Sequence, residues 1–202
     1  AGTTLTLDNT GASTIELGFA QSHGTTEATF SGGVVLTGTG SSNIIKVATG
    51  TTAADYAKEQ VFATGVISGS EKLAKSGVGR LKLTGDNTFS GGMDINDGTV
   101  VAGHADALGA SGNTVTINKG KLEVSSGITL SQGTINGGTN ASKKSMIGGD
   151  GTVSSITIGS GSGEIDVLSP GQGISSSLTE TSGLTKNQAG FGNGTADAAI
   201  GS

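Results

Sequence analysis

Cysteine and tryptophan are absent from this chain of 202 residues, and proline occurs once. Without cysteine no disulfide bond holds the fold together, although this absence does not identify the cellular compartment. Only 3% of the residues are aromatic and 33% are hydrophobic, so a compact two-layer core would have few large side chains to fill it. The composition therefore does not favour an ordinary globular core.

Positive charge and long apolar runs are also scarce. The 11 Lys and Arg residues against 16 Asp and Glu residues leave a net charge of −5, which argues against the basic stripe that nucleic-acid phosphates require. No apolar stretch approaches the roughly 20 residues that a membrane-spanning helix needs. We therefore expect no nucleic-acid partner and no membrane-spanning helix in this chain.

What the chain does contain is glycine, 38 residues of it, between short segments in which apolar and polar residues alternate. Regular alternation and a charged fraction of only 13% argue against disorder. The predicted strands lie at 4–7, 34–38, 44–47, 81–85, 114–117, 121–124, 128–130, 155–158 and 164–167. Turn signals such as Asp97-Gly98 and Asn136-Gly137-Gly138 separate them. Strands this short do not make stable isolated hairpins, but they suit one side of a repeating coil.

An internal repeat supports such a coil. The segment "INDGTVVA" (95–102) aligns with "INKGKLEV" (117–124), so that Ile95 corresponds to Ile117 and Val100 to Leu122. Ile135, in "TINGG" (134–138), is predicted to be the copy of Ile117 in the coil that follows. A period of about 20 residues with strand-turn-strand order indicates a β-solenoid, which we predict over positions 1–170.

In a solenoid, parallel strands of successive coils stack about 4.8 Å apart and alternate residues point into a narrow interior. The aliphatic residues predicted to fill it are Leu81, Leu83, Ile95, Val100, Ile117, Leu122 and Val124. Asn96 and Asn118 occupy equivalent turns, so their amides are predicted to stack as a ladder.

Three segments depart from the pattern. Residues 52–62 read as a short helical insertion, with Thr52 as its N-cap and Asp55 at the capping-box position. Residues 104–109 read as one helical turn that ends at Gly109. The Gly-, Ser- and Ala-rich segment 171–202 is expected to pack on the last coil or on a neighbouring subunit.

Residues 73–109 resemble the passenger-associated transport repeat of bacterial autotransporters. That family's pattern runs Lys-x-Gly-x-Gly-x-Leu-x-Leu-x-Gly, then Asn-Thr-aromatic-x-Gly-Gly, an apolar strand, a turn Gly and a closing Ala-Leu-Gly. Its positions here are Lys75, Gly77, Gly79, Leu81, Leu83, Gly85, Asn87, Thr88, Phe89, Gly91, Gly92, Ile95, Gly98, Leu108 and Gly109. Weaker similarity continues through 146–173. The resemblance implies a right-handed parallel β-helix, secretion, and residence at the bacterial cell surface or in the extracellular matrix. It implies no activity, because the motif is a folding and transport element.

Some solenoids are polysaccharide lyases or hydrolases, which use pairs of carboxylates on an exposed face. The candidates are Asp94 with Asp97, Asp106, and Glu164 with Asp166. None has a paired-carboxylate spacing, and solvated surface acids explain them better.

Other chemistry is equally sparse. His23 and His104 lie in different coils with no Ser or Cys motif nearby. The segment "GGDG" (148–151) resembles calcium-binding nonapeptide repeats, but these need tandem copies and one is visible. The sequence therefore predicts no catalytic, cofactor-binding or metal-binding residue and no enzyme.

Three hypotheses for function remain. The first is a secreted structural β-solenoid that associates with itself head to tail into an extracellular fibre. The second is an adhesin or passenger module of a larger autotransporter that binds a host or glycan ligand. The third is a polysaccharide-acting enzyme. The start "AGTT", without Met, is expected of a mature secreted chain or of an excised fragment.

Overall fold

The computed structural model describes residues 3–11, 14–19, 28–40, 42–47, 60–132, 134–137, 145–153, 155–158, 167–170 and 177–180. Within these ranges the regular structure consists of strands alone, arranged in four sheets. The first sheet has the order β1 (Thr4–Asp8), β4 (Gly33–Thr37), β7 (Ile67–Gly69). The second has the order β14 (Thr134–Gly137), β12 (Thr114–Ile117), β10 (Met93–Ile95), β8 (Leu73–Ser76), β5 (Ser42–Val47), β2 (Thr14–Phe19).

The other two sheets complete the coils. The third has the order β17 (Val167–Pro170), β15 (Ser145–Gly149), β13 (Gly120–Val124), β11 (Thr99–Ala102), β9 (Arg80–Leu83), β6 (Gln60–Ala63), β3 (Ala28–Phe30). The fourth pairs β16 (Ser155–Ile158) with β18 (Ser177–Glu180). Every described pair is parallel and joins strands of successive coils.

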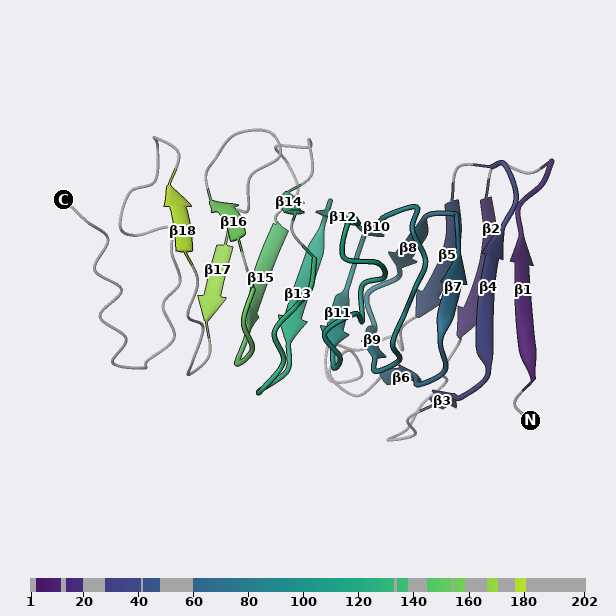
Figure 1. The fold of residues 1–202 in the computed structure, drawn as a ribbon, viewed down its shortest axis with the longest axis horizontal. Coiled ribbons are helices and arrows are strands. Elements are labelled where there is room, and N and C mark those ends of the chain that lie inside the picture. Colours follow the sequence, from purple (N-terminus) through teal and green to yellow (C-terminus); the bar gives the residue numbers. More distant parts are fainter. Residues whose placement is uncertain are drawn as a thin grey trace.

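The strands lie side by side along the long axis of the molecule, from β1 near the N-terminus to β18 (Figure 1). This arrangement is that of a parallel β-solenoid and confirms the predicted all-β fold. The right-handed sense of the coil stays a prediction.

The internal repeat is confirmed by the register of the sheets. Ile95 pairs with Ile117, and Val100 pairs with Leu122. The predicted alignment of Ile135 with Ile117 is wrong, because Ile135 pairs with Val115 and Ile117 pairs with Gly137. Lateral hydrogen bonds between coils set the register, and the coils differ in length.

The predicted interior is confirmed. All seven aliphatic residues assigned to it have at most 1% of their surface exposed, and Phe89 is buried with them. The amide Nδ2 of Asn118 donates to Oδ1 of Asn96 over 2.8 Å, which confirms the predicted ladder between coils.

Tight corners explain part of the glycine content. Gly98 has φ of 69°, a left-handed conformation that favours glycine. A Cβ there would lie 2.5 Å from the carbonyl oxygen of Gly77 in the preceding coil, so the coils stack closely only without a side chain.

The predicted helix over 52–62 is wrong at its C-terminal end. Gln60, Val61 and Phe62 belong to β6, which pairs in parallel with β3 and β9. Hydrogen bonds to both neighbouring coils outweigh the local helix-forming residues there. Residues 52–59 lie outside the described part of the chain.

Two smaller expectations also change. Asn136 and Gly137, predicted to be in a turn, end β14, and the predicted strand 128–130 contributes one isolated bridge, between Thr129 and Thr152. The predicted helical turn at 104–109 consists of two successive hydrogen-bonded turns. Ala107 N donates to His104 O over 3.2 Å, and Gly109 N donates to Asp106 O over 3.0 Å. No helix in the described part of the chain has the length and apolar character needed to cross a bilayer.

Candidate metal-binding cluster

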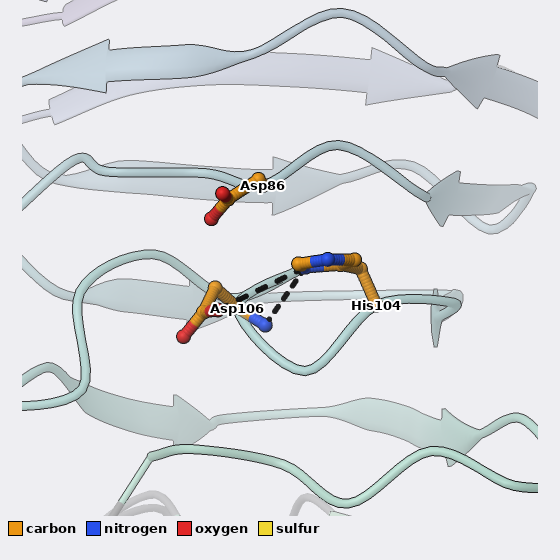
Figure 2. Close-up of side chains that lie close together, drawn as sticks. All are labelled: Asp86, His104 and Asp106. Carbon is orange, nitrogen blue, oxygen red and sulfur yellow. Dashed lines mark hydrogen bonds and ion pairs between the residues drawn. The ribbon is translucent and has the colours of Figure 1, made fainter.

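Among the described residues, one group of three potential metal ligands comes together: Asp86, His104 and Asp106. Asp86 follows β9, and the other two follow β11 in the next coil. Because Leu83 at the end of β9 pairs with Ala102 at the end of β11, the loops after these strands stack on one another. Figure 2 shows the carboxylates of Asp86 and Asp106 at the same end of the cluster, with the imidazole of His104 extending toward them.

The local turn sets the position of His104 relative to Asp106. The backbone N–H of Asp106 donates to Nδ1 of His104 over 3.1 Å, and this nitrogen lies 3.9 Å from Oδ2 of Asp106. One ligand atom from each of the three residues lies within 4.8 Å of the others. An imidazole that accepts at Nδ1 carries its proton on Nε2 when neutral.

A third coil orients the Asp106 carboxylate. The hydroxyl of Ser131 donates to Oδ1 of Asp106 over 2.5 Å, and Ser131 N donates to Ala105 O over 3.0 Å. Asp86 is exposed and makes no hydrogen bond or ion pair within the described structure. The side chains of His104 and Asp106 are 40% and 34% exposed, so solvent reaches the cluster.

This geometry does not make a Ser-His-Asp nucleophile. Such a triad requires the serine hydroxyl to donate to the histidine, which abstracts its proton. Ser131 instead donates to Asp106, and its proton has no path to His104 through the observed contacts. Two carboxylate oxygens with one imidazole nitrogen are, however, a ligand set that suits a divalent transition metal.

The acids considered from the sequence fall into two groups. Asp94 forms an ion pair with Lys72 over 3.1 Å, and Asp97 forms one with Lys119 over 3.2 Å. These exposed and half-exposed pairs are surface features. Asp106 is the exception, because it joins the cluster.

The remaining candidates add no described site. Glu164, Asp166 and His23 lie outside the described residues. In the segment 148–151, Gly148 and Gly149 end β15, and Asp150 is exposed in the bend that follows.

Sequence reasoning considered His104 and Asp106 separately and did not consider Asp86. The register between neighbouring coils is the signal that would have brought Asp86 together with the other two residues. Leu83 pairs with Ala102, and continuing this register along both loops places Asp86 opposite Ala105, between His104 and Asp106.

The comparisons with known proteins agree with this fold. A family model described as the passenger-associated transport repeat matches residues 73–102, which span β8 to β11. The chain thus resembles the passenger domains of bacterial autotransporters, as its sequence motif predicts.

One relative shares a longer segment. The "Adhesin BmaC autotransporter" of Brucella suis biovar 1 (strain 1330) is 33% identical over 97 residues, which is 48% of this chain. The match spans 3% of the length of that protein. No solved structure matches the chain. The repeat and the adhesin match agree with the predicted location, secreted and at the bacterial cell surface.

Proposed function

We propose that this chain is a surface-displayed passenger module of the adhesin type, a β-solenoid rod that presents its outer faces to a host or glycan ligand. One observation carries the proposal: the residues that match the passenger repeat form the strands β8 to β11, in which β8 pairs with β10 and β9 pairs with β11. The segment that matches an autotransporter family is the segment whose strands stack in register.

Ion pairs on the outer surface join different coils of the rod. Arg80 donates to both carboxylate oxygens of Glu123, across the intervening β11. Lys72 and Asp94 bridge two neighbouring coils in the same way. Ion pairs that remain accessible to solvent, as these do, contribute about 0–1 kcal/mol each, so the buried aliphatic stack supplies most of the stability. The proposal assigns the chain a structural and binding role and no catalytic step.

Display on bacteria tests this proposal. The chain, fused to the translocator of a well-expressed autotransporter, is displayed on a laboratory strain without adhesins, and adherence to cultured epithelial cells is counted. We expect a protease-resistant chain at the surface and several-fold more adherent bacteria than with the translocator alone.

Ile117→Asp is the matched control, because it buries an unpaired charge in the solenoid interior and unfolds the coil. It should be degraded and should abolish adherence. A folded, displayed parent chain that adheres no better than the translocator alone would contradict the adhesive role.

Head-to-tail assembly into a fibre is the second candidate. It is supported by the first strands of the three main sheets: β1, β2 and β3 each have one strand neighbour within the described structure. Their outer edges carry backbone donors and acceptors that can pair with another coil, including one from a second copy.

A further inference from the structure

We propose that Asp86, His104 and Asp106 bind one divalent transition-metal ion of the zinc class, which ties two successive coils together on the outside of the solenoid. This inference does not rest on the adhesive role. It follows from the ligand types, from their separation, and from the way that two of the three side chains are held.

The separation fits an ion after a small movement. Around a tetrahedral ion with bonds of about 2.1 Å, neighbouring ligand atoms lie about 3.4 Å apart. Nδ1 of His104 and Oδ2 of Asp106 are already 3.9 Å apart, and the full set lies within 4.8 Å. Closing the site therefore requires shifts on the scale of a side-chain rotation.

Asp86 is the ligand that can make this movement at low cost. Its side chain is exposed and has no partner to give up within the described structure. Asp106 is held by Ser131 from the next coil, an outer-shell contact of the kind that orients metal ligands. Binding at Nδ1 of His104 replaces the hydrogen bond from the Asp106 N–H. Because Asp106 is a half-exposed residue, water can take the place of that acceptor.

The imidazole determines which cation is preferred. Calcium and magnesium take oxygen ligands, whereas imidazole nitrogen favours zinc, copper and nickel. Three protein ligands leave one tetrahedral position for water. Because Asp86 comes from one coil and His104 and Asp106 come from the next, the ion acts as a clip that binds the folded state and not the unfolded chain, and so raises its melting temperature.

Calorimetric titration of the full chain with zinc chloride tests the site, using protein purified without a histidine tag. We expect one zinc ion per chain and a melting temperature that rises by a few degrees with excess zinc. Calcium chloride should give neither effect.

The chain contains two histidines, which provides a matched pair of variants. His104→Asn and Asp86→Asn should each weaken zinc binding by at least about tenfold, and His23→Asn should leave it unchanged. Ser131→Ala should weaken it by about tenfold through the lost outer-shell contact.

Circular dichroism of the zinc-free variants checks that each is folded. Asp86→Asn, which removes no described contact, is the decisive variant. No saturable zinc binding by the parent chain, or equal binding by the parent and Asp86→Asn, would overturn the proposal.

Discussion

Lys75 is a charged residue at an interior position of the solenoid. It stands in register between Ile45 and Ile95, and none of its surface is exposed. Its alkyl stem occupies the place of an aliphatic side chain. Its Nζ donates to the carbonyl oxygens of Ser76 over 2.9 Å, of Gly77, and of Asp97 over 3.1 Å. From the interior, the lysine thus donates hydrogen bonds to backbone carbonyl oxygens at the corner between the second and the third sheet.

Burial lowers the pKa of Lys75 to about 8 from 10.5, and the nearby charge of Asp97 opposes this shift. The unfolded chain keeps the proton up to the higher value, so it binds more protons than the folded chain between these pH values. The contribution of Lys75 to the free energy of unfolding therefore rises as the pH increases from about 8 to 10.5, and this gain is lost as the pH falls back to about 8.

Urea unfolding of the parent chain and of Lys75→Met across this pH range tests the assignment. We expect the stability of the parent to rise relative to that of Lys75→Met as the pH increases. Lys46→Met, which changes an exposed lysine that pairs with Glu16 and not with Asp97, serves as the control and should track the parent. Parallel profiles for the parent and Lys75→Met would show that Lys75 titrates normally.

At the scale of the element, β5 contains an unsatisfied polar residue. Asn43 lies in register with Leu73, and the same stack continues through Met93, Val115 and Ile135. All five side chains are at most 2% exposed. Within the described part of the chain, neither Nδ2 nor Oδ1 of Asn43 has a hydrogen-bond partner. A buried amide in this state costs about 1–3 kcal/mol.

Asn43→Leu should therefore stabilise the chain by about 1–2 kcal/mol, because it removes the unpaired amide and continues the apolar stack with a side chain of the same branching. Equilibrium unfolding in urea measures the change. Asn118→Leu is the matched control, since the Asn118 amide is paired with Asn96, and it should destabilise by about 1 kcal/mol. A less stable Asn43→Leu variant would mean that the Asn43 amide has a partner in solution.

At the scale of the whole molecule, the open sheet edges lead to a prediction about assembly. A heterologous head-to-tail contact propagates and does not close, so self-association through these edges produces filaments. Electron microscopy and light scattering of the purified chain at high concentration should show fibres. A stable monomer would rule out the second candidate and leave the passenger module.

A charged edge provides the control for this experiment. Thr4 and Thr6 of β1 are exposed, and lysines on an edge strand discourage pairing with another chain. The double variant Thr4→Lys, Thr6→Lys should remain folded and form fewer fibres than the parent. Equal fibre formation would place the contact elsewhere on the chain.

The sequence by itself determined the interior and the basic coil. Alternation placed Leu81, Leu83, Val100 and Leu122 inside, because successive residues of a strand point to opposite faces. The internal repeat paired Ile95 with Ile117, and with it the Asn96–Asn118 ladder, because similar coils stack equivalent positions. These features follow from local periodicity, which a single sequence displays.

Only the tertiary structure decided where coils of unequal length meet. Ile135 pairs with Val115, and residues 60–62 form a strand, because hydrogen bonds to neighbouring coils are non-local and outweigh local pattern and propensity. The cluster of Asp86 with His104 and Asp106 has the same origin. Its members belong to loops of different coils with no shared motif, and only the register of β9 on β11 brings them together.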